Sequence, residues 1–194
     1  MNNELIQIIK QDLKQNVTGK RYDHIIGVAY TAASIAMRYG YDMEQAFMAG
    51  LLHDCAKHMN GAQLIQICEE SKVPISDVER RNPFLLHGKV GAIIAKEKYN
   101  IVDHVILDSI RYHTTGRPDM TMLDKIIFVA DYIEPNRRQL EGLNEVRTLV
   151  FQNLDDGVVR ILQMTINYLK SNENQEIDST TLETFQYYNN RKEI

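Results

Sequence analysis

Apolar residues recur along this chain with the spacing of helices rather than strands. Leu5, Ile6, Ile9 and Leu13 lie on one face of a helix of about 3.6 residues per turn. No segment alternates apolar and polar residues for long enough to predict a β-strand. Capping residues and helix breakers set the expected ends, and a short turn of helix should follow Ser76. The predicted helices cover residues 4–16, 22–39, 43–58, 60–71, 84–98, 104–113, 122–133, 144–151, 155–170 and a last one from Thr180.

Several helix ends are marked by residue types that cap helices. Asp42, Asp103 and Thr121 each precede an apolar run, where they can accept hydrogen bonds from the free backbone N–H groups of a first turn. Pro135 should end the run before it, because proline cannot continue a helix. The pattern predicts one all-α domain over residues 1–194, a helical bundle of about eight to ten helices.

Composition and charge exclude several classes of protein. The 194 residues are 44% hydrophobic and carry a formal net charge of −4, which is typical of a globular domain and argues against a nucleic-acid polymer as partner. No apolar stretch reaches the roughly 18 residues of a membrane span, and no signal-peptide core is present. Cys55 and Cys68 are too few for a disulfide framework, so we expect reduced thiols in a cytoplasmic protein. A homodimer is compatible with the sequence. The polar segment 171–181 is expected to be a loop.

Six histidine and aspartate residues stand out, several of them beside apolar runs. His53 and Asp54 follow the run 46–52, and Asp131 follows the run 126–130. A buried imidazole or carboxylate is costly to desolvate without a partner, and a metal ion compensates both. Nitrogen and oxygen ligands without cysteine favour iron, manganese or cobalt, and less well magnesium, over a closed structural zinc site. We therefore predict a centre of two metal ions with the ligands His24, His53, Asp54, His87, His113 and Asp131.

Each of these residues, taken singly, has a more common structural role. A lone histidine on an apolar helix face is usually a hydrogen-bonded core residue, and a lone buried aspartate usually caps a helix or forms an ion pair. The adjacency of His53 and Asp54, together with Asp131 in a second apolar run, favours the metal centre instead. We expect the two remaining histidines, His58 and His104, to lie outside it.

Three segments of the chain resemble one family of enzymes. They are LLHDCAK at 51–57, HTTGRPDMT at 113–121 and LDKIIFVADYIEPNR at 123–137. Together they are similar to the YqeK family of HD-domain phosphohydrolases, which are bacterial symmetrical bis(5'-nucleosyl)-tetraphosphatases. The His-Asp pair alone is weakly specific, whereas the HTTGRP and ADYIEP runs are strongly specific. The resemblance extends over most of the chain and implies an all-α HD-domain bundle that holds two divalent or mixed-valence metal ions, usually iron.

The resemblance also implies a role for each matched residue. One ion would be held by His24, His53, Asp54 and Asp131, and the other by Asp54, His87 and His113, with Asp54 bridging the two. Nucleotide contacts are implied for Arg21, Lys57, Thr114, Thr115 and Arg137. The segment around Ile177 and Asp178 would help to hold the nucleoside, although Ser179 stands where the family pattern has proline.

These residues predict metal-dependent hydrolysis of a small dinucleoside polyphosphate. Two ions about 3.5–4 Å apart lower the pKa of a bridging water and neutralise the phosphoryl oxygens under attack. The hypothesis is that a bridging hydroxide attacks an inner phosphorus of diadenosine tetraphosphate and releases two ADP, with Asp54 and Lys57 as catalytic residues. The alternatives are an HD phosphohydrolase of nucleoside monophosphates or cyclic nucleotides, and a non-catalytic nucleotide sensor. The intact set of candidate ligands argues against the sensor.

Overall fold

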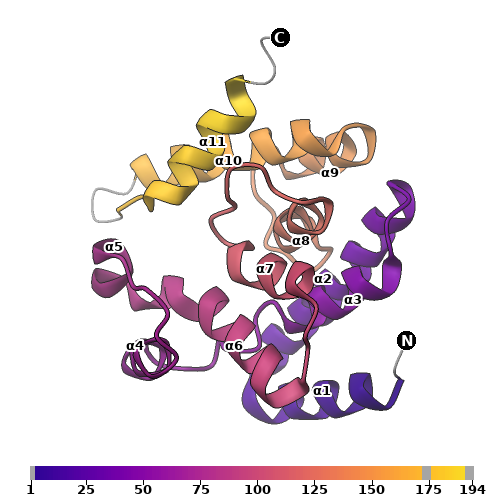
Figure 1. Ribbon diagram of the computed structural model, residues 1–194. Coiled ribbons are helices and arrows are strands. Elements are labelled where there is room, and N and C mark those ends of the chain that lie inside the picture. The colour runs from indigo at the N-terminus through magenta and orange to yellow at the C-terminus, as the bar shows by residue number, and fades with distance from the viewer. Residues whose placement is uncertain (1–2, 172–175, 191–194) are drawn as a thin grey trace.

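The computed structural model describes residues 3–171 and 176–190, and every regular element in these ranges is a helix (Figure 1). The predicted all-α class is therefore confirmed. The described ranges hold eleven α-helices and one short 3₁₀-helix, η1, which is more than the expected number. The elements are α1 (Asn3–Asn16), α2 (Gly19–Arg38), α3 (Met43–Leu52), α4 (Gly61–Glu70), α5 (Asp77–Arg81), η1 (Pro83–Leu86), α6 (His87–Tyr99), α7 (His104–Tyr112), α8 (Met122–Ile133), α9 (Leu143–Gln152), α10 (Leu154–Ser171) and α11 (Ser179–Asn190).

Most helix starts fall where the capping residues stand. The side chains of Asp42 and Asp103 accept hydrogen bonds from the first backbone N–H groups of α3 and α7. Thr121 and Asp124 form a reciprocal capping box at the start of α8. Helix α2 begins three residues before the predicted start because Thr18 caps it by accepting a hydrogen bond from the Arg21 backbone. These local bonds fix where four of the helices that position candidate ligands begin.

The largest departure from the prediction is at the end of α3, which stops at Leu52 and not at residue 58. The chain beyond it runs in tight turns, with Cys55 N–H bonded to Leu52 and Lys57 N–H bonded to Asp54, three residues back. Cys55 and Ala56 are both buried there, so the apolar pattern continues past the end of the helix. The predicted helix 84–98 is likewise divided into η1 and α6.

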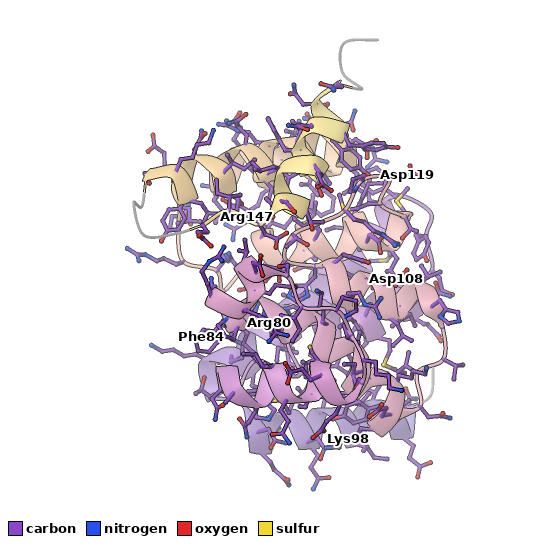
Figure 2. All side chains as sticks on the ribbon, turned by 60° about the vertical axis from the view of Figure 1, so that its left-hand side comes forward. Arg80, Phe84, Lys98, Asp108, Asp119 and Arg147 are labelled. Atoms are coloured by element: carbon purple, nitrogen blue, oxygen red, sulfur yellow. The ribbon has the colours of Figure 1, made fainter. Side chains whose placement is uncertain are left out.

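Helix α8 is the central element of the bundle. It contacts α2, α3, α7, α9 and α10, and Figure 1 shows it surrounded by them. Ile126, Ile127 and Val129 are completely buried, so Asp131 near the end of the helix is carried into the interior. Charged side chains such as Arg80 and Lys98 lie on the outside (Figure 2). No helix of the described ranges combines the length and the apolar character that crossing a membrane requires.

Helices α2 and α3 approach each other closely at Gly50. A Cβ atom there would lie 2.8 Å from the Cα of Ala29, so no larger residue fits without moving the backbone. This close packing sets the α2 histidine, His24, beside the residue that follows α3, His53, with ring centroids 5.4 Å apart. The apolar packing of two helices therefore positions the first pair of candidate ligands.

Candidate metal centre

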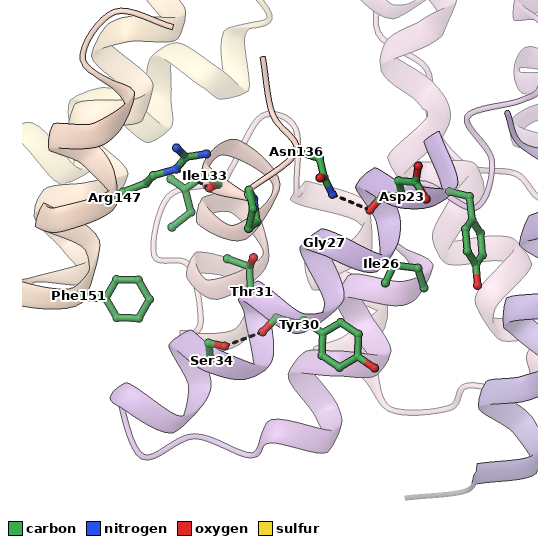
Figure 3. Close-up of a pocket in the computed structure, with 12 residues that line it drawn as sticks. Asp23, Ile26, Gly27, Tyr30, Thr31, Ser34, Ile133, Asn136, Arg147 and Phe151 are labelled. Carbon is green, nitrogen blue, oxygen red and sulfur yellow. Dashed lines mark hydrogen bonds between the residues drawn. The ribbon is translucent and has the colours of Figure 1, made fainter. Parts of the chain in front are cut away.

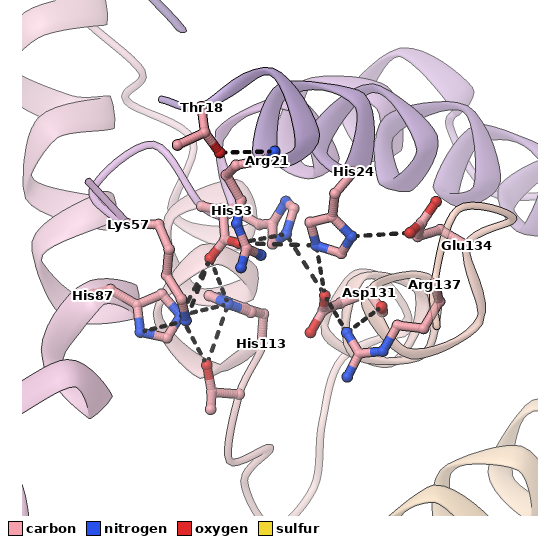
Figure 4. Close-up of polar contacts among 12 residues, drawn as sticks. Thr18, Arg21, His24, His53, Lys57, His87, His113, Asp131, Glu134 and Arg137 are labelled. Atoms are coloured by element: carbon pink, nitrogen blue, oxygen red, sulfur yellow. Dashed lines mark hydrogen bonds and ion pairs between the residues drawn. The ribbon is translucent and has the colours of Figure 1, made fainter. Parts of the chain in front are cut away.

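All six predicted ligands meet in one cluster at the centre of the bundle (Figure 4). His53 and Asp54 come from the turn after α3, and Asp131 comes from the last turns of α8. The side chain of Asp131 is 24% exposed, whereas the other five residues are buried. The contributing segments are α2 with His24, the turn after α3 with His53 and Asp54, α6 with His87, the turn after α7 with His113, and α8 with Asp131.

The carboxylate of Asp54 lies between two groups of imidazoles. Its Oδ2 is 3.8 Å from His24 Nε2 and 3.6 Å from His53 Nε2. Its Oδ1 is 3.3 Å from His87 Nε2 and 3.7 Å from His113 Nε2. Each oxygen of one carboxylate thus faces its own pair of ring nitrogens, which is the arrangement needed by a residue that bridges two ions.

Three of the histidines are oriented by the same local bond. Nδ1 of His53 donates to Gly50 O at 2.7 Å, and Nδ1 of His113 donates to Ile110 O at 2.7 Å. His87 makes the equivalent bond to Phe84 O. Because a carbonyl only accepts, Nδ1 must carry the proton, and Nε2 is left with a free lone pair directed at the cluster. Each histidine directly follows a helix or 3₁₀ segment, so its ring can reach a carbonyl of the last turn.

The fourth histidine, His24, is oriented by a carboxylate that the sequence analysis did not single out. Its Nδ1 is 3.1 Å from Oε1 of Glu134, which is 1% exposed. Oε2 of Glu134 accepts the Asn136 backbone N–H at 2.7 Å, so both oxygens are engaged. Metal-ligating histidines commonly donate their second nitrogen to a carboxylate in this way. The position of Glu134, three residues after Asp131 and before Pro135, is the sequence feature that could have indicated it.

The charge state of the cluster suits metal binding. Burial lowers the pKa of His53, and burial lowers the pKa of His113 to about 3, so both rings are neutral at pH 7. Burial opposes ionisation of Asp54, but its electrostatic interactions with the neighbouring His53, His87 and Lys57 hold its pKa well below the usual range, so it is a carboxylate. His53 Nε2 and Asp54 Oδ1 are buried and have no hydrogen-bond partner among the described residues. Such unpaired atoms are expected where an ion would bind.

Four of the five predicted substrate-binding residues reach the edge of the cluster. Arg21 donates to Asp54 Oδ2 at 2.6 Å, and Nζ of Lys57 lies 3.0 Å from His87 Nε2. Oγ1 of Thr114 is 3.2 Å from His113 Nε2, and Nη1 of Arg137 is 3.4 Å from Asp131 Oδ1. The fifth, Thr115, donates its hydroxyl to Gly116 O instead. As expected, His58 and His104 are exposed and contact no member of the cluster.

Comparisons with known proteins show which family the chain belongs to. The HD domain family model matches residues 21–136. The symmetrical bis(5'-nucleosyl)-tetraphosphatase of Bacillus subtilis (strain 168) is 39% identical over 175 residues, which are 90% of this chain and 92% of that protein. The protein of the same name from Halalkalibacterium halodurans is 41% identical over the same shares. The chain belongs to the symmetrical bis(5'-nucleosyl)-tetraphosphatase family of HD-domain hydrolases.

A solved structure is similar to this tetraphosphatase family member over nearly the whole fold. The crystal structure of a predicted HD superfamily hydrolase involved in NAD metabolism, from Clostridium acetobutylicum, superposes with a TM-score of 0.92. The two chains are 38% identical, and the match covers 96% of this chain and 97% of the other. The resemblance seen in the sequence is therefore confirmed.

Three cavities of this tetraphosphatase family member are lined by residues next to the cluster in sequence or in space. The smallest, of about 240 Å³, lies beside Thr114 and Thr115 and is closed by Asp178 and Ser179, where the predicted nucleoside contact falls. Ser179 is the first residue of α11, and residues 172–175 of the predicted loop lie outside the described ranges. A groove of about 870 Å³ opens beyond Arg137. A third cavity, of about 900 Å³, contains no predicted site residue but is lined by Gly27 and Asn136, the neighbours of Glu134 (Figure 3).

Proposed function

We propose that this protein cleaves diadenosine tetraphosphate symmetrically into two molecules of ADP. The observation that supports this most directly is the Asp54 carboxylate, whose two oxygens face separate histidine pairs. This arrangement suits a hydrolase that uses two ions to attack a phosphoanhydride. The relatives that match most of the chain are named for symmetrical hydrolysis of dinucleoside tetraphosphates, which supports the substrate.

The six clustered residues fit a pair of metal ions. His24, His53, Asp54 and Asp131 would hold one ion, while Asp54, His87 and His113 would hold the other, with iron as the expected metal and manganese or cobalt as alternatives. When bound, the ions supply a water of lowered pKa and neutralise charge on the phosphoryl oxygens. The shared position of Asp54 would keep the ions close, and the backbone bonds of the histidines would keep each Nε2 directed inward.

The cationic side chains explain how the substrate would be centred. Lys57 lies beside His87 at one end of the cluster, Arg21 bonds to the central Asp54, and Arg137 lies beside Asp131 at the other end (Figure 4). A tetraphosphate carries negative charge along its whole length, so cations at both ends would place its middle over the cluster. Lys57 is partly buried, which lowers its pKa, and its ammonium would donate to a phosphoryl oxygen beside the bond that breaks. We assign catalytic roles to Asp54 and Lys57 on this basis.

Product analysis of freshly purified protein tests the proposal. Chromatography should show ADP as the sole nucleotide product of diadenosine tetraphosphate, and elemental analysis should show bound metal. Asp54→Ala should lose metal and turnover together, whereas Lys57→Ala should keep the metal and lose activity. His104→Ala, at an exposed histidine, is the matched control and should retain both. Release of AMP and ATP would contradict symmetrical cleavage, and release of phosphate from nucleoside monophosphates alone would favour the other HD phosphohydrolases.

A further inference from the structure

A symmetrical dinucleotide has two identical halves, so a site that cleaves it at the middle needs two nucleoside-binding surfaces. This reasoning rests on the proposed function. The cavity beside Thr114 and Asp178 provides one surface, next to the His87–His113 end of the cluster. At about 240 Å³ it lies below the usual range for small-molecule sites, so it is too small for the whole dinucleotide. The other half must leave the cluster in another direction.

The groove beyond Arg137 lies at the other end of the cluster. Arg137 lines this groove, and its Nη1 is also 3.1 Å from the carbonyl and 3.4 Å from Oδ1 of Asp131. Tyr132, the residue after Asp131, lies under the Arg137 guanidinium at 5.3 Å from the ring centroid. In Figure 4, Arg137 and His87 stand at opposite ends of the cluster. A tetraphosphate that starts in the small cavity and crosses the cluster would therefore reach this groove.

The lining of the groove matches the chemistry of a nucleoside diphosphate. Its volume of about 870 Å³ falls within the usual range for small-molecule sites. Arg138 and Arg160 add two further cations beside Arg137, and guanidinium groups match phosphate oxygens geometrically. Arg160 also lies 3.2 Å from Glu145, but both side chains are exposed, and exposed ion pairs contribute little to stability. The cations thus offer a path for the phosphates away from the cluster.

The same groove offers surfaces for the sugar and the base. Tyr168 on α10 is 63% exposed and Leu140 is 38% exposed, and both line the groove together with Met164. Exposed aromatic rings stack with nucleobases of any sequence. Glu141 is the only acidic residue among the groove-lining residues; it would repel phosphate but accept hydrogen bonds from ribose hydroxyls. We infer that this groove, from Arg137 to Tyr168, binds the second nucleoside diphosphate half of the dinucleotide substrate.

The test compares two substrates in variants of the groove. Adenosine tetraphosphate has the same phosphate chain as diadenosine tetraphosphate but lacks the second nucleoside. In the wild type, kcat/KM should favour the dinucleotide. Tyr168→Leu and Arg138→Gln should reduce that preference on the order of tenfold, because a lost base stack alone has about this effect. Tyr30→Leu and Arg80→Gln alter exposed residues outside the groove and the cluster, so the preference should not change.

A binding measurement separates the groove from the chemistry. A dinucleotide analogue with a methylene group in place of the central bridging oxygen should bind Tyr168→Leu about tenfold more weakly than wild type, through a raised Kd. An unchanged preference and an unchanged Kd in both groove variants, with an active wild type, would overturn the inference but leave the proposed function standing. A wild type that does not cleave the dinucleotide would overturn both. Circular dichroism confirms that each variant is folded.

Discussion

The contact between His24 and Glu134 leads to the sharpest prediction about metal affinity. Glu134 is 1% exposed, and its Oε1 is 3.1 Å from His24 Nδ1. A hydrogen bond to a charged group contributes about 1.5–3 kcal/mol, and about 1.4 kcal/mol corresponds to a tenfold change. Glu134→Ala should therefore weaken metal binding about 10- to 100-fold, as is usual for carboxylates behind ligating histidines. Glu134→Gln keeps the length but not the charge, and should have a smaller effect.

Gly27 offers a way to perturb this contact without altering Glu134. A Cβ at residue 27 would lie 2.3 Å from Oε2 and 3.2 Å from Cδ of Glu134, so the carboxylate would have to move. Gly27→Ala should then weaken metal binding in the same direction as Glu134→Gln. Gly19→Ala is the matched control, because a Cβ there meets nothing within 4 Å. This exchange at the first residue of α2 should leave metal binding unchanged.

The assay is a metal titration against a competing chelator, with kcat and KM measured in parallel. Asp124→Asn serves as the stability control, since Asp124 is also 1% exposed but bonds to Arg117 and the α8 cap, away from the cluster. It should lower the thermal midpoint and leave metal affinity unchanged. If Glu134→Ala and Gly27→Ala bind metal as tightly as the wild type while folded, the orienting role of Glu134 is wrong.

Three further results are expected. Removal of metal by a chelator should abolish turnover and lower Tm, because ions that bind only the folded state stabilise it by about 2.7 kcal/mol at a hundredfold excess over Kd; an unchanged Tm would argue against the centre. The hydrogen bond from Lys98, at 2.6 Å, lowers the pKa of Asp12 in the folded protein. The pair therefore stabilises the fold above the unfolded-state pKa of about 3.9, and this stabilisation is lost as pH falls through the folded-state pKa of Asp12. Asp12→Asn should therefore lower the free energy of unfolding near neutral pH by less than about 1 kcal/mol, measured as a lower urea midpoint. In strong acid the variant and the wild type should be equally stable, and a difference that persists there would refute the pairing. Burial raises the pKa of Cys55 to about 12, so iodoacetamide should label it only after denaturation, and rapid labelling of the native protein would contradict its burial.

Much of the fold could be predicted because helix starts are encoded locally. Asp103 and the Thr121–Asp124 box lie where their bonds form, and the bounds of α8 agree with the prediction. Helix ends were harder, as α3 shows. Its apolar run continues through Cys55 and Ala56 into turns that are buried by other segments, so hydrophobic periodicity could not separate the helix from the turns.

The candidate site was predictable in its members but not in its supporting contacts. The candidate ligands are residue types that are costly to bury, so their placement beside apolar runs distinguishes them. Glu134 was not singled out because glutamate before proline at a helix end is ordinarily exposed, and only the packing of α2 against α8 buries it. The family resemblance implied a nucleotide contact for Thr115 as for Thr114, whereas its hydroxyl donates to the Gly116 carbonyl. Side-chain direction within a turn depends on backbone geometry that spacing does not determine.

The common bond of three histidines connects local and tertiary structure in this centre. His53, His87 and His113 each donate to the carbonyl three residues earlier, so the end of a helical segment fixes the tautomer and the direction of each ring. Such rings need no distant partner to be ready for a metal ion. His24 lies inside α2, where the carbonyls are already bonded, and it therefore needs Glu134 from another part of the chain. The centre should consequently be most sensitive at His24, where its geometry depends on the packing of α8 against α2.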